Sequence, residues 1–176
     1  MTATNAREDQ KVHELLTGAI DIRIARDGTW YHEGGAIRRK PMVKLFAGIL
    51  RRDDDGSFCL QTPYEKRTII VEDAPFVAVE AMVSRAEEGQ AVRFRTNVDD
   101  EVTAGPDHPI RVEIDAETGE PSPYVLVREG LEALIARSVY YDLVGHGRTD
   151  TRDGREVLGI DSGGCFFVLG EIADDA

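Results

Sequence analysis

The sequence predicts an α+β fold of mostly antiparallel strands with two amphipathic helices. Many short runs alternate apolar with polar side chains, which is the pattern of half-buried antiparallel strands. Two other runs place their apolar residues at helical spacing. A similar order of strand, turn, helix and glycine-containing loop occurs in both halves of the chain. We therefore expect an internal duplication with two similar halves.

The first elements are a short helix and a hairpin. Residues 1–16 are expected to be a flexible start followed by a short helix, "KVHELLTG", which ends at Gly18. In "IDIRIARDGTWYHEGG" three isoleucines alternate with polar residues, and an Asp-Gly turn leads into a second strand through Trp30. This pattern predicts a β-hairpin.

The first amphipathic helix is expected in "PMVKLFAGIL". Pro41 suits a first helical turn because it has no amide hydrogen to leave unpaired. Met42, Leu45, Phe46 and Ile49 fall on one face of this helix. We therefore expect Phe46 to be buried beneath this helix.

Further strands and a second helix follow. The runs "SFCLQT", "KRTIIVE", "FVAVEAMVSRA", "QAVRFRTNV" and "IRVEI" predict strands. "GLEALIARSVYYDLV" predicts the second helix, and "GREVLGI" with "GGCFFVLG" predicts a closing hairpin. "TAGPDHP" marks the expected boundary, so the halves are predicted over residues 17–105 and 106–176.

Composition narrows the class of protein. The net charge of −12 over 176 residues argues against a general nucleic-acid binder, which needs positive faces for phosphates. "MTATNAREDQ" lacks the apolar core of a secretory signal, and "FVAVEAMV" is too short to insert into a membrane. Two cysteines are too few for a disulfide scaffold. We expect a cytoplasmic protein.

Known reaction signatures are not found. The four histidines are scattered, and "RRDDDGSFCLQT" fails as a calcium loop, so no metal or other cofactor is expected. Ser162 in "DSGG" falls in a predicted hairpin turn rather than at a nucleophile elbow. Cys59 and Cys165 lie in apolar strands, where core packing is expected.

A local concentration of positive charge points to an anion. "RRKPMVKLFAGILRR" holds six basic residues and no acidic one. Most of them suit a solvated helix face, but Arg39 lies on the apolar side near the helix N-terminus, where a cation is unfavourable. Arg39 therefore needs an acidic partner or a bound anion.

The stretch "TPYEKRTIIVEDAPF" supplies a candidate partner. Neighbouring side chains of a strand project to opposite faces, so either Glu65 or Lys66 is expected to face inward. In the structural interpretation, Glu65 pairs with Arg39. In the functional interpretation, Glu65, Lys66 and Arg39 are polar side chains that contact a ligand in a cleft, and the ring of Trp30 forms one wall of that cleft.

A family resemblance rests on motifs spread along the chain. "WYHEG", "LFAGIL", "DDDG", "TPYEK", "VEDAPF", "TNVDD", "AGPDHP", "PYVLVREGLEALIARSVYYDLV" and "SGGCFFVLG" together resemble the bacterial family of domain of unknown function 1285. The resemblance covers about residues 17–170. It implies a duplicated α+β core with a C-terminal half similar to pleckstrin-homology folds.

The resemblance also implies a site. It places a cleft for a nucleotide-like ligand between the halves and suggests a role in bacterial signalling, with a possible protein partner. Carried onto this chain, the residues near the cleft are Trp30, His32, Arg39, Thr62, Glu65, Lys66, Thr96 and Asn97. The residue patterns by themselves select four of these (Trp30, Arg39, Glu65 and Lys66).

Three functions stay open. The first is a non-enzymatic sensor or regulatory module that binds a small anionic, nucleotide-like ligand. The second is a hydrolase in which Glu65 acts as base with His32 nearby. The third is a protein-interaction domain that uses exposed sheet edges.

Overall fold

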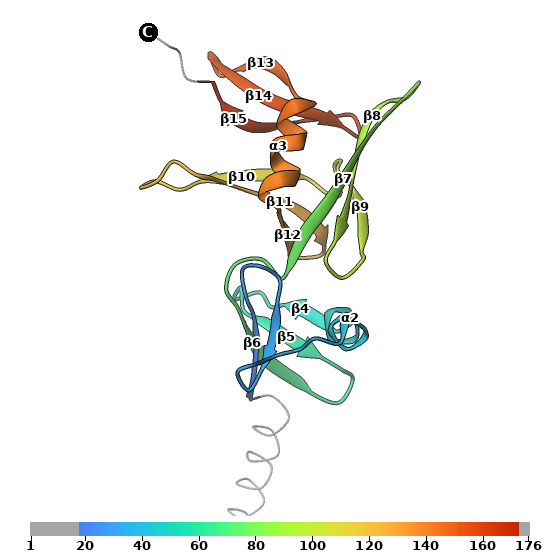
Figure 1. The fold of residues 1–176 in the computed structure, drawn as a ribbon, viewed down its shortest axis with the longest axis vertical. Coiled ribbons are helices and arrows are strands. Elements are labelled where there is room, and N and C mark those ends of the chain that lie inside the picture. The colour runs from blue at the N-terminus through green and yellow to red at the C-terminus, as the bar shows by residue number, and fades with distance from the viewer. Residues whose placement is uncertain (1–17, 173–176) are drawn as a thin grey trace, which may run out of the picture. The chain divides into compact units, whose positions relative to one another are not determined.

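The computed structural model describes residues 18–172, which form two compact units (Figure 1). The chain divides between Asp73 and Ala74. The boundary expected near residue 105 falls inside the second unit, between two strands of one sheet. The short helix expected before Gly18 lies outside the described residues.

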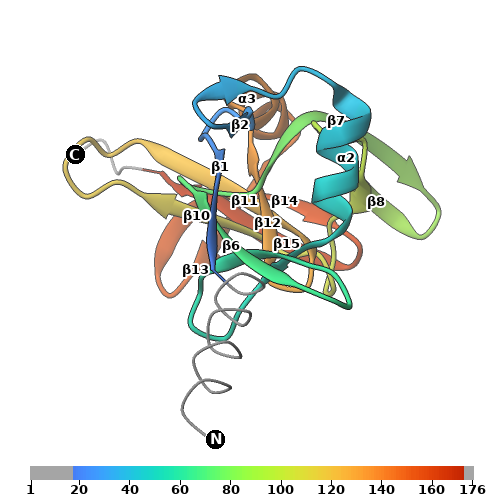
Figure 2. The same cartoon turned by 90° about the horizontal axis from the view of Figure 1, so that it is seen from below.

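The first unit is a six-stranded sheet with one helix, drawn blue to green in Figure 1. Its strands are β1 (Ala19–Ile24), β2 (Trp30–His32), β3 (Gly35–Ala36), β4 (Leu50–Arg52), β5 (Phe58–Gln61) and β6 (Lys66–Val71). The helix α2 (Lys40–Gly48) connects β3 to β4 and is seen along its length in Figure 2. Alternating apolar residues in β1 bury Ile22 and Ile24, as the sequence predicts.

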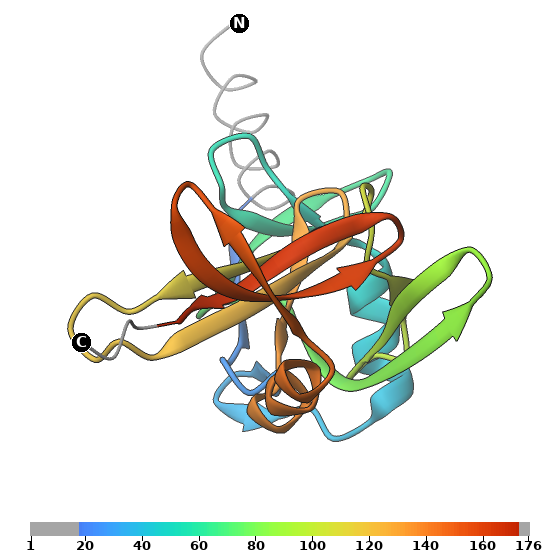
Figure 3. The ribbon, with the colours of Figure 1, turned by 90° about the horizontal axis from the view of Figure 1, so that it is seen from above.

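The second unit holds a larger sheet, a helix and a small sheet. The six-stranded sheet contains β7 (Phe76–Ala86), β8 (Gly89–Thr96), β9 (Glu101–Thr103), β10 (Ile110–Ile114), β11 (Pro121–Arg128) and β12 (Leu131–Ile135). After α3 (Arg137–Gly145), the strands β13 (Arg148–Arg152), β14 (Arg155–Ser162) and β15 (Cys165–Glu171) form a three-stranded sheet, drawn orange to red in Figure 3. The predicted closing hairpin is thus confirmed as β14 and β15.

Both six-stranded sheets have the same connectivity. The orders are β3-β2-β1-β6-β5-β4 and β10-β11-β12-β7-β8-β9. Each sheet consists of two three-stranded antiparallel meanders. In each, the first strand of the six pairs in parallel with the last, β1 with β6 and β7 with β12. The prediction of mostly antiparallel sheets is confirmed, and these two parallel pairs are additions to it.

The second predicted helix begins later than expected. Residues 131–135 form β12 rather than the first turns of the helix, and α3 starts only at Arg137. In β12 Leu131, Ala133 and Ile135 are buried in alternation, because the strand lies inside the sheet between β11 and β7. Burial on a two-residue period therefore decides the structure of a segment whose residues also suit a helix.

The first helix is less buried than its apolar face predicts. Phe46 and Ile49 are only half-buried, whereas Met42 and Leu45 are 42% and 67% exposed. Ala47 is the buried residue of α2. The expectation that Phe46 is buried beneath the helix is wrong, because part of this face borders an open pocket.

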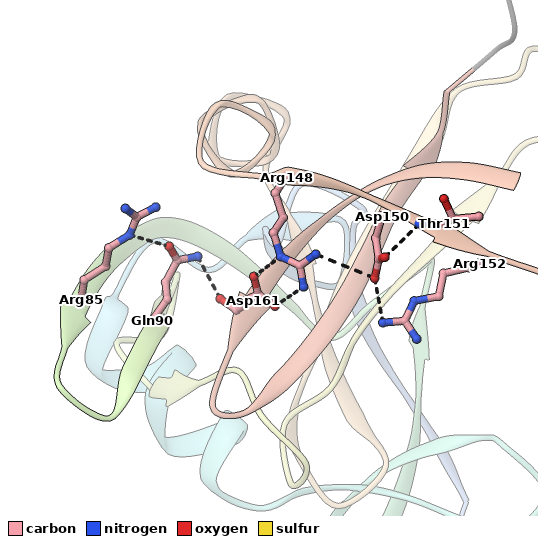
Figure 4. A network of polar contacts seen from close by, with 7 residues as sticks. All are labelled: Arg85, Gln90, Arg148, Asp150, Thr151, Arg152 and Asp161. Carbon is pink, nitrogen blue, oxygen red and sulfur yellow. Dashed lines mark hydrogen bonds and ion pairs between the residues drawn. The ribbon is translucent and has the colours of Figure 1, made fainter.

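Polar contacts join the small sheet to the large one within the second unit. The Gln90 side-chain amide donates a hydrogen bond to the carbonyl of Asp161 at 2.9 Å (Figure 4). The Asp161 carboxylate accepts two bonds from Arg148, at 2.6 and 3.0 Å. The buried Ser162 hydroxyl donates to the carbonyl of Ala104 at 2.7 Å and accepts from the amide of Val92 at 2.9 Å. Ser162 is thus a structural clamp; it is the last residue of β14, directly before the turn in which the sequence placed it.

Candidate functional site

A pocket of about 450 Å³ lies between α2 and the sheet of the first unit. Its volume is in the range of small-molecule sites, roughly 300–1,000 Å³. Seven apolar residues line it: Ile20, Ile22, Ile37, Met42, Phe46, Ile49 and Leu60. Four polar residues complete the lining: His32, Thr62, Glu65 and Arg67. All eleven belong to the first unit, and three of them (His32, Thr62 and Glu65) are predicted site residues.

The apolar lining follows from the periods of strand and helix. Ile20 and Ile22 are two residues apart on β1, so both project from the same face of the sheet. Met42, Phe46 and Ile49 are spaced by four and three residues, which places them along one side of α2. The pocket is therefore the gap between one face of the sheet and one side of the helix.

The pocket is apolar in its depth and polar at its mouth. Ile22 and Leu60 are almost fully buried, whereas His32 and Glu65 are exposed. His32 ends β2, and Glu65 lies in the turn between β5 and β6. A ligand that fills the pocket would bury an apolar body and keep a polar end near these two side chains.

Thr62 holds the turn that carries Glu65. Its hydroxyl oxygen accepts hydrogen bonds from the backbone amides of Tyr64 and Glu65, at 3.3 and 3.1 Å. The backbone of Thr62 also donates to the carbonyl of Glu65 at 2.9 Å. Thr62 therefore has a positioning role, because its hydroxyl is already engaged in a local turn.

Two polar side chains at the mouth are available to a ligand. Neither the Glu65 carboxylate nor the His32 imidazole has a hydrogen-bond or ion-pair partner among residues 18–172. Both are exposed, so water solvates them in the free protein. A ligand group that displaces this water must replace its hydrogen bonds to the Glu65 and His32 side chains.

Trp30 lies behind the pocket rather than in its wall. The indole is 1% exposed and stacks on Phe46, with ring centroids 6.1 Å apart and planes inclined by 20°. Its Nε1 has no hydrogen-bond partner in the described part of the chain. The expectation of a stacking wall is thus corrected: Phe46 faces the pocket, and Trp30 supports Phe46.

Arg39 and Glu65 do not form the predicted ion pair. Arg39 occupies the N-cap position of α2, is exposed and does not line the pocket. Water can solvate its guanidinium there, so the physical demand for an acidic partner disappears. Glu65 lines the pocket without Arg39.

Lys66 also lies away from the pocket, because it precedes Arg67 in β6 and projects to the other face of the strand. Its ammonium group contacts the Asp53 carboxylate at 2.7 Å. This hydrogen bond raises the pKa of Lys66 above its ordinary value. Either Glu65 or Lys66 was expected to face inward if both lay in the strand; Glu65 instead lies in the turn before β6, where it is exposed and lines the pocket mouth. Lys66 as a ligand handle is not supported.

Thr96 and Asn97 belong to the second unit, where they shape a turn. The Thr96 hydroxyl oxygen accepts from the amide of Asp100 at 3.1 Å and is fully buried. The Asn97 side-chain oxygen accepts from the amide of Val77 at 3.0 Å. These bonds fix the β8–β9 turn and the start of β7.

Arg67 is the polar lining residue that sequence reasoning missed. It is the second residue of β6 and comes two residues after Glu65, and both side chains line the pocket. That spacing is visible in the sequence, but the surrounding run "EKRTIIVED" has charges at both ends. Which charges share a pocket depends on where β6 begins.

Other reactive groups are accounted for by packing. Cys59 is buried, and burial raises the pKa of its thiol. Cys165 is only half-buried, although it was expected to be buried.

Among residues 18–172, no three His, Cys, Asp or Glu side chains cluster as metal ligands would. Within the same range no helix has the length and apolar character needed to cross a membrane.

Family models match both units of the chain. Residues 12–74 match the N-terminal domain and residues 75–169 the C-terminal domain of a protein of unknown function, DUF1285. None of the curated proteins matches the chain.

Two solved structures resemble the chain. A DUF1285 family protein from Silicibacter pomeroyi DSS-3 is 48% identical, with a TM-score of 0.79 over 88% of this chain and 82% of that one. A DUF1285 family protein from Shewanella baltica OS155 is 26% identical, with a TM-score of 0.55 over 72% of this chain and 91% of that one. The chain therefore belongs to the DUF1285 family, as its sequence motifs predict.

Proposed function

We propose that the first unit is a small-molecule binding module that acts in regulation rather than in catalysis. The observation that carries this proposal is the pocket between α2 and the sheet, with its apolar depth and polar mouth. A sensor or regulatory role in bacterial signalling, with or without a protein partner, is consistent with such a module. The cleft expected between the two halves stays a prediction.

The ligand has an apolar body and a polar end. Burying the body against seven apolar side chains supplies the binding free energy, and the four polar residues orient the end group. The nucleotide-like ligand expected from the sequence is one member of this class. For such a ligand, Arg67 is the cation among the described lining residues that could contact a phosphate.

Hydrolysis by Glu65 and His32 is the weaker alternative. Both residues line the pocket, which supports their use together. However, a general base must be oriented toward its proton, and neither side chain is held by a hydrogen bond within the described residues. The Thr62 hydroxyl, the nearest candidate nucleophile in the lining, is engaged by backbone amides.

We also propose that the two six-stranded sheets derive from a duplication. Their identical connectivity, including the parallel pairing of first and last strands, supports this origin. In the second unit the two meanders are followed by α3, an arrangement compatible with the pleckstrin-homology-like fold that the family resemblance implies. Superposition of β1–β6 on β7–β12 tests the duplication, and a failure of corresponding strands to overlap would refute it.

The binding proposal is tested with N-phenyl-1-naphthylamine, an uncharged dye that fluoresces in apolar sites. Met42 lines the pocket and is accessible, so Met42→Trp should fill the pocket without disturbing the core. Leu45 is on the same helix and more exposed but does not line the pocket, so Leu45→Trp is the matched control. We expect the dye to bind wild type and Leu45→Trp equally and Met42→Trp at least tenfold more weakly. Equal binding to all three proteins would refute the proposal.

A further inference from the structure

We infer that the pocket in the first unit selects a ligand whose polar end donates an N–H group, an amide or an ammonium, rather than a phosphate or carboxylate. This inference rests on the proposed function, since it names the ligand class for the same pocket. It goes against the anionic ligand expected from the sequence, and three features of the lining carry it.

The first feature is the Glu65 carboxylate at the mouth. It lines the pocket and has no partner in residues 18–172. An ionised carboxylate only accepts hydrogen bonds, so a ligand that displaces its water must donate one. An amide or ammonium does so, whereas a second anion would leave two like charges in a partly dry site.

The second feature is the balance of charge around the pocket. Glu65 and Arg67 contribute one charge of each sign to the lining. The two other cations that an anion would need are elsewhere: Lys66 contacts Asp53, and Arg39 is exposed outside the pocket. Among the described residues, the lining therefore has no net positive charge to hold a phosphate.

The third feature is the interior. The depth of the pocket is lined by aliphatic side chains such as Ile22 and Leu60, together with the ring of Phe46. A nucleobase placed there would leave its ring nitrogens and exocyclic groups without hydrogen bonds, which is costly in an apolar site. An alkyl chain has no such groups, so it fits this interior better than a base.

Calorimetric titration of the full chain with a matched ligand series tests the inference. The probes are octanamide, octylamine, octanoate, octyl phosphate and adenosine monophosphate. We expect octanamide and octylamine to bind at least tenfold more tightly than the three anions. Their N–H groups donate a hydrogen bond to the Glu65 carboxylate, whereas an anion is repelled by it. From hexanamide to octanamide, affinity should rise about fourfold per added methylene.

Variants of two carboxylates assign the preference to Glu65. Glu65→Gln should reduce the ratio of octylamine to octanoate affinity by at least tenfold, since the negative charge is lost and an acceptor remains. Asp54 is an exposed acid in the same unit that does not line the pocket, so Asp54→Asn should leave the ratio unchanged.

The outcomes separate this inference from the binding proposal. If adenosine monophosphate or octyl phosphate binds as tightly as octanamide and loses binding in Met42→Trp, the ligand class is wrong and the binding proposal stands. If none of the alkyl ligands binds although the dye shows Met42-dependent binding, the ligand class is again wrong. If none of the alkyl ligands binds and the dye binds wild type and Met42→Trp equally, both proposals are wrong.

Discussion

Replacing Ser162 by alanine tests the clamp between the two sheets of the second unit. The Ser162 side chain is fully buried and satisfies two backbone groups of other strands and loops, the amide of Val92 and the carbonyl of Ala104. Ser162→Ala removes both partners without filling the space of the hydroxyl. Each buried backbone group left unpaired costs about 1–3 kcal/mol. We therefore expect the free energy of unfolding to fall by roughly 2–6 kcal/mol, which is a large share of a typical domain stability of about 5–15 kcal/mol.

Urea denaturation followed by circular dichroism measures this loss. The midpoint should fall while the slope with denaturant concentration is unchanged, because the surface exposed on unfolding is the same. Ser84 is the matched control, since its hydroxyl is exposed and its contact with the carbonyl of Ala91 is long, at 3.5 Å. Ser84→Ala should change stability by no more than about 0.5 kcal/mol. If Ser162→Ala is equally mild, the clamp does not stabilise the unit and the reasoning is wrong.

Three further predictions concern Gly159, Asp161 and Cys59. A Cβ on Gly159 would lie 2.4 Å from the Phe166 ring, so Gly159→Ala should destabilise by about 3 kcal/mol or more in urea denaturation. The Arg148 guanidinium lowers the pKa of Asp161 below 3.8, so Arg148→Ala should raise that pKa in an NMR titration. The ionised Asp161 then stabilises the fold above pH 3.8, and this contribution is lost as pH falls through the lowered pKa. The buried Cys59 thiol, with its raised pKa, should react with a thiol reagent far more slowly than an exposed thiol.

Each of these predictions has a control or a contradicting result. A Cβ on Gly145, at the end of α3, would meet no other atom within 4 Å, so Gly145→Ala should be neutral or mildly stabilising. An Asp161 pKa that does not move in Arg148→Ala would show that the two side chains are not coupled in solution. Labelling of Cys59 as fast as that of the half-buried Cys165 would contradict its burial.

The sequence by itself determines much of the local structure. Alternating apolar residues predict β1 and the hairpin of β14 and β15, because each strand buries one face. The spacing of Glu65 and Lys66 predicts opposite faces only where both lie in the strand; Glu65 precedes β6 and lines the pocket mouth, whereas Lys66 contacts Asp53. Family membership also follows from the sequence, since many weak motifs in a fixed order are specific together.

Only the tertiary structure decides how these elements combine. Residues 131–135 become a strand because β11 and β7 pair with their backbone on both edges, and these partners come from other segments of the chain. Arg39 needs no acidic partner because its side chain is exposed to solvent. Trp30 does not line the pocket because Phe46 packs between its ring and the pocket. A sequence fixes the period and polarity of each segment, whereas the side chains that meet across a pocket come from distant segments whose pairing depends on the packing of the whole unit.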